Sequence, residues 1–125
     1  MKQSTLDPKV RQALSRGGTI DITTVGRKTG APRRIEIEFH TIGDRIYISG
    51  LASPRRRSWL ANLEANPTFT FHLKGAVKAE LPAQARIITG ETERQTVLAE
   101  VAKAWNRRDL EKMVQQSPLI EVTFD

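Results

Sequence analysis

The sequence predicts a mainly β protein with flanking helices, an α+β domain built around an antiparallel Greek-key or barrel-like sheet. Three observations support this prediction. Several short segments alternate apolar and polar residues, as strands do. Tight turns join several of these segments, and parallel strands would need crossovers of about a dozen residues or more. The 125 residues are enough for one compact core but too few for two, so we expect a single domain over residues 1–125.

The first half of the chain contains one short helix and three strands. Asp7 is a good N-cap, Pro8 suits the first helical position, and a pair of glycines ends the helix. β-branched residues dominate the next segment, and the one after it alternates strictly, which places Ile35, Ile37 and Phe39 on one face. The predicted elements are a helix at residues 8–16 and strands at residues 19–25, 34–40 and 45–49.

The second half mixes helices and strands. Residues 50–57 are a loop leading into a helix that begins near Pro54 and ends near Pro67. Pro82 predicts a bulge or an edge position within the longer extended stretch, because proline cannot donate to a sheet ladder. The elements expected after this helix are strands at residues 68–73, 76–89 and 119–124, and helices at residues 91–106 and 108–116.

Composition excludes several classes of protein. Apolar residues make up 38% and charged residues 27%, values typical of a soluble globular domain. No apolar run approaches the roughly 20 residues of a membrane span, and the first residues lack the apolar core of a signal peptide. Without cysteine, and with two isolated histidines, we expect neither a disulfide nor a metal site. A cytoplasmic location is the resulting expectation.

The positive charge is concentrated in one quarter of the chain. The net charge is +6, and residues 27–57 hold eight Lys or Arg against three Asp or Glu. A concentrated basic region attracts polyanions. Nucleic acid, a membrane surface, and a phosphorylated or polycarboxylate cofactor all satisfy this condition, and composition does not choose among them.

The most distinctive segment is the basic loop after the first strand. Gly26 and Gly30 allow backbone amides to approach a ligand, and Arg27, Lys28 and Arg33 supply charge-assisted donors. The loop therefore suits an acidic small molecule. Taken alone, it is also explained as a solvated hairpin.

Two motifs together resemble the deazaflavin (coenzyme F420)-dependent nitroreductase family. They are Ile-Thr-Thr-Val-Gly-Arg-Lys-Thr-Gly-Ala-Pro-Arg at residues 22–33 and Trp-Leu-Ala-Asn-Leu-Glu-Ala-Asn-Pro at residues 59–67. The resemblance is close over residues 20–73 and looser afterwards. It implies a split β-barrel of the FMN-binding-protein kind, and a reductase that transfers a hydride from F420H2 to a small electrophilic acceptor such as a quinone, an enone or a nitro compound. Ordinary FMN is the alternative cofactor.

The resemblance also implies a cofactor site. F420 carries an acidic ring system, a phosphodiester and a polyglutamate tail, so it needs a row of fixed cations. A helix N-terminus beside three arginines offers a phosphate cradle in addition. The implied residues are Arg27, Lys28, Thr29, Arg33 and Arg34 at the phosphate and tail, Ile35 and Glu36 on the next strand, Ser49, Gly50, Leu51 and Ala52 at the ring, and Arg55, Arg57, Ser58, Trp59 and Asn62 around the following helix.

The acceptor is less defined. Family members that reduce nitro compounds carry several tyrosines around the acceptor pocket, whereas this chain has Glu38-Phe39 at the first such place and no tyrosine after Tyr47. No catalytic side chain is assigned, and both histidines, His40 and His72, are expected to be satisfied or at the surface. Related split barrels often pair their sheets, so a homodimer is consistent with the resemblance.

Two other functions fit part of this pattern. A split barrel can bind flavin, haem or a fatty acid without hydride chemistry. A basic domain can also bind nucleic acid electrostatically. Against nucleic acid, aromatic residues make up only 6% of the chain and are not interleaved with the basic ones.

Overall fold

A computed structural model describes residues 7–125. The predicted helices and strands are present, with ends that shift by a few residues. In chain order the elements are α1 (Pro8–Arg16), β1 (Gly18–Val25), β2 (Pro32–Ile42), β3 (Arg45–Ser49), α2 (Ser58–Ala65), β4 (Thr68–Lys74), β5 (Lys78–Ile87), α3 (Glu91–Ala104), α4 (Leu110–Gln116) and β6 (Leu119–Phe124).

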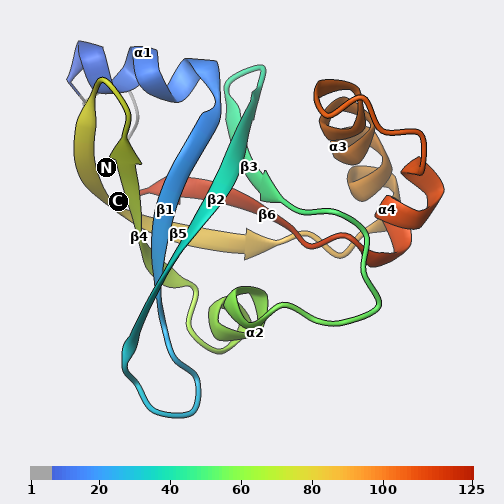
Figure 1. Ribbon diagram of the computed structural model, residues 1–125, viewed down its shortest axis with the longest axis horizontal. Helices are drawn as coiled ribbons and strands as arrows, with labels where there is room; N and C mark the ends of the chain where they lie inside the picture. Colours follow the sequence, from blue (N-terminus) through green and yellow to red (C-terminus); the bar gives the residue numbers. More distant parts are fainter. Residues whose placement is uncertain (1–6) are drawn as a thin grey trace.

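The six strands form a closed antiparallel barrel in the order β1-β2-β3-β6-β5-β4 (Figure 1). Pairing of β4 with β1 closes it. The strands β1, β2 and β3 follow one another as hairpins, and β4 returns beside β1 after the long connection that contains α2. This arrangement is a Greek key and confirms the predicted fold class.

The barrel interior is filled by the alternating apolar residues of the strands. Phe71 lies at its centre with no exposed surface. Its ring contacts those of Phe39 and Phe124 edge to face, with centroids 5.2 Å apart in both cases. Edge-to-face pairs add to the stabilisation that apolar burial already gives.

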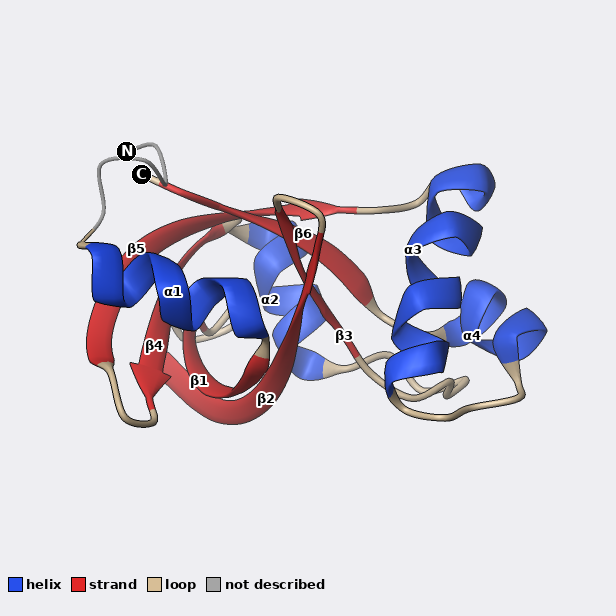
Figure 2. Cartoon of the chain, turned by 90° about the horizontal axis from the view of Figure 1, so that it is seen from above, coloured by secondary structure: helices blue, strands red, loops and turns tan. Residues whose placement is uncertain are grey.

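Helices cover two outer faces of the barrel (Figure 2). α1 lies across the β2 side, where Asp7 caps it by accepting from the Lys9 amide at 2.8 Å. α3 and α4 pack against β3 and β6 as a second apolar cluster, which contains Tyr47. Tyr47 is therefore a packing residue on the outer face of the barrel. Within residues 7–125, no helix is long and apolar enough to cross a lipid bilayer.

Of the two alternatives expected for Pro82, the bulge does not form, whereas the edge position agrees with the structure, because the pairing of β5 with β6 begins only at Ala83. Pro82 pairs in register with Thr70, and the ladder continues on both sides of it. Its carbonyl accepts from the Asp125 amide at 3.1 Å, so its ring nitrogen faces the end of β6. A missing N–H at that point leaves no ladder bond unmade, which is why proline is tolerated without distortion.

The two histidines differ in their surroundings. His72 is satisfied, with Nε2 2.7 Å from Thr23 Oγ1 and Nδ1 3.1 Å from Glu80 Oε2. His40 packs edge to face against Trp105, with centroids 4.9 Å apart, and its buried Nε2 has no partner among the described residues. His40 is thus not satisfied in the way the sequence led us to expect. Burial lowers the pKa of the His40 imidazole, and the nearby Glu38 carboxylate offsets part of this effect.

We expect the domain to lose stability below pH ~6.5, the ordinary histidine pKa, in part because of His40. The lowered pKa of His40 means that the unfolded chain binds its proton more readily than the folded chain. The contribution of neutral His40 to the free energy of unfolding is therefore fully present above that pH and is lost as the pH falls through the lowered pKa. Urea denaturation at pH 7.5 and pH 5.0 measures it. His40→Gln should show a smaller fall in the free energy of unfolding than the wild type, and an equal fall would contradict this account.

Candidate functional site

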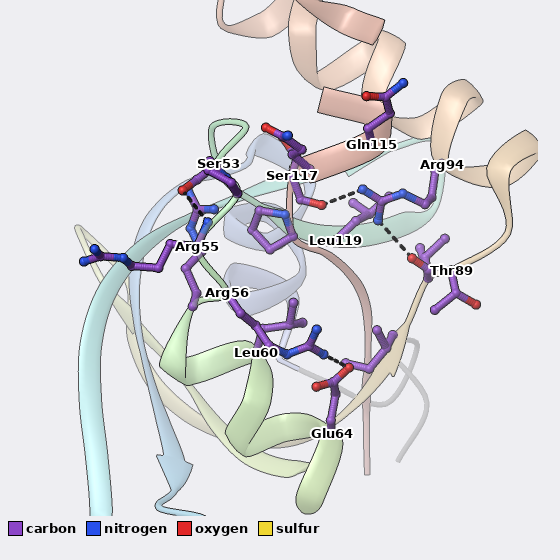
Figure 3. Close-up of a pocket in the computed structure, with 16 residues that line it drawn as sticks. Ser53, Arg55, Arg56, Leu60, Glu64, Thr89, Arg94, Gln115, Ser117 and Leu119 are labelled. Carbon is purple, nitrogen blue, oxygen red and sulfur yellow. Dashed lines mark hydrogen bonds and ion pairs between the residues drawn. The ribbon is translucent and has the colours of Figure 1, made fainter. Parts of the chain in front are cut away.

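Two clefts flank helix α2, and the basic segments of the sequence line them. The turn–helix cleft, of about 460 Å³, lies between the β1–β2 turn and one side of α2. The arginine cleft, of about 520 Å³, lies between the other side of α2 and the ends of α3 and α4 (Figure 3). The turn–helix cleft is lined by Thr24, Gly26, Arg27, Lys28, Thr29, Arg33, Ile35, Ser58, Trp59 and Asn62.

Strand alternation decides which cations reach the turn–helix cleft. Arg33 and Ile35 of β2 line it, so Arg34 and Glu36 project from the opposite face of the same strand. There Arg34 Nε lies 2.9 Å from the Asp21 carboxylate. Lys74 bonds both Asp21 and Glu36. Arg34 and Glu36, which the motif resemblance placed at the cofactor, thus take part in an ion network on the outer face, where Lys74 and then Arg34 lower the pKa of Asp21.

The turn itself has a defined conformation. The Gly26 amide donates to the Ala31 carbonyl at 2.8 Å, and the Gly30 amide donates to the Gly26 carbonyl at 2.7 Å. A side chain at Gly26 would lie 3.0 Å from the Ala31 carbonyl, and Gly30 has a φ of +74°, so both positions favour glycine. The closed turn presents Lys28 toward the cleft.

Asn62 connects this turn to α2. Its side chain is buried, and its Oδ1 accepts from the Arg27 backbone amide at 3.2 Å and from Arg27 Nη1 at 2.9 Å. Its Nδ2 donates to Thr24 Oγ1 at 3.1 Å. Trp59, one turn earlier on the same face, belongs to the barrel core and also lines the cleft. The two segments that the sequence singled out therefore meet.

The loop before α2 differs from the sequence expectation. The helix begins at Ser58 and not near Pro54, so the three arginines precede it in the loop, which bends at Pro54 and Arg55. Arg57 takes the N-cap position without a capping side-chain bond, which leaves the first backbone amides of α2 without a side-chain acceptor. Its Nη2 donates to the Leu51 carbonyl at 2.7 Å.

Gly50 makes room for that guanidinium. A Cβ on Gly50 would lie 3.1 Å from both Arg57 Nη2 and Pro118 Cγ, so the close approach this glycine allows is that of Arg57. Ser49, just before it, donates to the Pro118 carbonyl at 2.7 Å and ties β3 to the start of β6. Leu51 is 47% exposed, and Ala52 packs against the second apolar cluster. None of these four residues lines either cleft.

Arg55, Arg56 and Arg57 all line the arginine cleft. Arg56 pairs with Glu64, whereas Arg55 and Arg57 have no carboxylate partner among the described residues. Partial burial lowers the pKa of Arg57, which marks a cation that an anionic ligand would stabilise.

The far wall of the arginine cleft contains Arg94 and Ser117, residues that the sequence reasoning missed. Arg94 donates to four backbone carbonyls and so caps the end of α4. Figure 3 shows its bond to Ser117. Ser117 is buried, and its hydroxyl has no partner within residues 7–125. An arginine in the first turns of a helix gave no sequence signal of this capping role. The four acceptors are the carbonyls of Ile88, Met113, Val114 and Ser117.

Comparison with known families identifies the chain. The model of the F420H(2)-dependent quinone reductase family matches residues 2–122, almost the whole sequence. The protein belongs to this family. Membership makes it an F420-dependent reductase with F420 as its cofactor, as the two motifs implied. None of the curated proteins is similar enough in sequence to match the chain.

Solved structures agree on the fold. The chain is similar to the F420-H2 dependent reductase FDR-A, with a TM-score of 0.60 and 24% identity over 83% of this chain and 92% of that one. It is also similar to the haem storage protein HutZ from Vibrio cholerae, with a TM-score of 0.68 and 17% identity over 100% and 92%. A conserved hypothetical protein from Mycobacterium tuberculosis is similar with a TM-score of 0.73 and 14% identity, over 96% of this chain and 81% of that one. These likenesses confirm the split barrel of the quinone reductase family.

The donor set of this quinone reductase family member fits F420. No Asp or Glu is among the described residues that line the turn–helix cleft, and Lys28 and Arg33 face it. The arginine cleft adds two unpaired guanidinium groups, and the uncapped start of α2 lies between the clefts. Phosphate and carboxylate groups strung along one ligand match this row of cations.

We expect Arg94 to hold the arginine cleft in shape. Replacing it with leucine removes the side-chain donor from four partly buried carbonyls, of which, within residues 7–125, only that of Met113 keeps a bond from the Ser117 amide, and should lower the free energy of unfolding by roughly 2–3 kcal/mol. Arg94→Lys keeps the charge but reaches fewer carbonyls, so its free energy of unfolding should lie between those of the wild type and the leucine variant. Urea denaturation measures both, and a leucine variant as stable as the wild type would contradict the capping role.

Proposed function

We propose that the chain transfers a hydride from F420H2 to a small electrophilic acceptor, with quinones favoured over enones and nitro compounds. The family description names quinone reduction, which supports this choice. The scarcity of tyrosine supports it as well, since Tyr47 is the single tyrosine and it packs under α3, away from both clefts. The acceptor pocket of nitro-reducing members is built from tyrosines that this chain lacks.

The observation that carries the proposal is the meeting of two basic segments at the start of α2. Lys28 and Arg33 lie on one side of the helix, and Arg55 and Arg57 lie on the other. Their guanidinium and ammonium groups would bind the phosphodiester and the carboxylates of the coenzyme. Trp59, buried against the barrel core, would exclude water from one side of the bound molecule.

The chemistry belongs to the coenzyme, and the protein supplies binding and orientation. When bound, F420H2 supplies a hydride and a proton, so that a quinone becomes a hydroquinone and F420H2 becomes F420. The loop at residues 50–57 would help to orient the coenzyme and the acceptor. Its two ends are joined by the bond from Arg57 to the Leu51 carbonyl, beside Gly50. Holding donor and acceptor in one orientation lowers the entropic part of the barrier.

The binding site is tested by removing one cation from each cleft. Lys28→Ala combined with Arg57→Ala should raise the Kd for F420 about a hundredfold, because each lost charge-assisted contact is worth roughly 1.4 kcal/mol. Fluorescence titration of the purified protein with F420H2, F420 and FMN measures this, and wild-type affinity for FMN should be weaker than for F420.

A matched control separates local binding from net charge. Arg34→Ala combined with Lys78→Ala also removes one Arg and one Lys, but from the outer face and from the start of β5. Its Kd for F420 should stay within about threefold of the wild type, since exposed charges farther away are screened by salt. Equal weakening in both double variants would refute the site assignment and leave only a general basic surface.

The acceptor is tested by turnover. With F420H2 in excess, a soluble quinone should oxidise the coenzyme at least about tenfold faster than a nitroimidazole, the difference that about 1.4 kcal/mol of transition-state binding produces. Loss of F420H2 absorbance measures both rates. A nitroimidazole rate equal to or above the quinone rate would contradict the proposed acceptor class.

A further inference from the structure

Asn62 is a buried amide on the apolar side of a short helix, and its role differs from that of a cofactor ligand. It is 3% exposed, between the core residues Trp59 and Leu63. A buried amide without partners is costly, so its bonds reveal what it does. They cross from α2 to the β1–β2 turn and reach Arg27 and Thr24.

The Asn62 side chain has little capacity left for a ligand. Its oxygen accepts two N–H groups of Arg27, one from the backbone and one from the guanidinium, which occupies both lone pairs. Its nitrogen donates one hydrogen to the buried hydroxyl of Thr24. A coenzyme could contact the second hydrogen of this nitrogen, but any contact with the oxygen would require a bond to Arg27 to break.

The same bonds fix the direction of Arg27. One edge of its guanidinium is drawn back to Asn62, and Nη1 also lies 3.5 Å from the Ser58 carbonyl. Anchoring the Arg27 peptide orients the next residue of the turn, Lys28. The internal bonds from Gly26 and Gly30 close the turn, but they do not attach it to the rest of the molecule.

We propose that Asn62 is a positioning residue that preforms the anion-binding turn by holding the Arg27 peptide against α2. The coenzyme then meets a turn that is already ordered, and binding does not have to supply the entropy of ordering it. Lys28 and Arg33 make the anion contacts, while the main role of Arg27 is to attach the turn to α2 through its bonds to Asn62. This inference rests on the proposed F420 site for its functional consequence, but its structural part stands independently.

The structural part is tested in the protein without coenzyme. Asn62→Leu keeps the branching of the side chain at Cγ and removes all three bonds. Hydrogen exchange of the Arg27 and Lys28 amides, followed by NMR, should accelerate at least about fivefold relative to the wild type, because local opening of the turn becomes easier. Amides of the barrel core, such as that of Phe71, serve as the internal reference and should be unchanged.

Rescue by a near-isosteric group tests the geometry. Asn62→Asp keeps the oxygen that accepts from Arg27, and the Thr24 hydroxyl can rotate to donate to it, so exchange at the Arg27 amide should remain close to wild type. If Asn62→Leu does not fold, Asn62→Ser replaces it, since the shorter hydroxyl does not reach Arg27. Rapid exchange in Asn62→Asp would overturn the proposed role of the oxygen.

The functional part is tested by titration and steady-state kinetics. Asn62→Leu should raise the Kd and KM for F420H2 about tenfold, equivalent to roughly 1.4 kcal/mol, and leave kcat at saturating coenzyme unchanged. Thr123→Val, at an exposed position of β6 that lines neither cleft, should leave the Kd within about threefold of the wild type.

The outcomes are distinguishable. Faster exchange with a raised Kd supports the proposal. A raised Kd without faster exchange would show direct contact between Asn62 and the coenzyme and overturn it. Faster exchange with an unchanged Kd would also overturn it. Failure of the wild type itself to bind F420 would remove the proposed function. Accelerated exchange in Asn62→Leu would still show that Asn62 attaches the turn to α2.

Discussion

Closure of the barrel between β1 and β4 is the constraint from which the site follows. β4 begins three residues after α2 ends, and it pairs antiparallel with β1 at Thr23 and Thr70. Antiparallel pairing brings the start of β4 to the end of β1, so α2 must lie beside the turn that follows β1. The bonds from Asn62 to Arg27 and Thr24 then fix a proximity that the topology already imposes. Two motifs about 25 residues apart meet for this reason.

Alternation along β2 separates binding charge from structural charge. Neighbouring arginines at 33 and 34 point to opposite faces, and only Arg33 reaches the turn–helix cleft. The residues facing outward form an ion network with Asp21, Lys74 and Glu36. Exposed ion pairs of this kind contribute little to stability. Their effect is to satisfy Arg34 and Lys74 on the outer face, whereas Arg33 on the cleft side has no carboxylate partner among the described residues.

Much of the fold was predictable because it depends on local pattern. Strict alternation marked the strand around Ile37, and Asp7-Pro8 marked the first helix start. The start of α2 was misplaced because Pro54 is an acceptable first helical residue, whereas in the structure residues 54–57 belong to the loop before the helix. Pro82 was predicted at a bulge or an edge, and it takes the edge, because a proline just beyond the part of β5 that pairs with β6 needs no bulge.

The site was predictable in part, and its limits have a physical cause. Motif residues on the turn and on α2 do meet, as Lys28 and Trp59 show. Arg94 and Ser117 come from segments outside both motifs, and their place in the arginine cleft depends on how α3 and α4 pack against β3 and β6. The role of Asn62 was hidden for a different reason. A polar residue on the buried side of a helix has the same sequence pattern whether it binds a ligand or an internal partner.

The fold alone does not determine the ligand, since a haem storage protein shares it at a TM-score of 0.68. The distribution of charge is more specific. Haem presents two carboxylates at one edge of a flat ring, whereas the cations that line the two clefts lie on opposite sides of one helix. A compact anion would satisfy only one of these clefts. A long ligand with several anionic groups would reach both and would pass the uncapped start of α2, where burial lowers the pKa of Arg57, a cation without a carboxylate partner within residues 7–125.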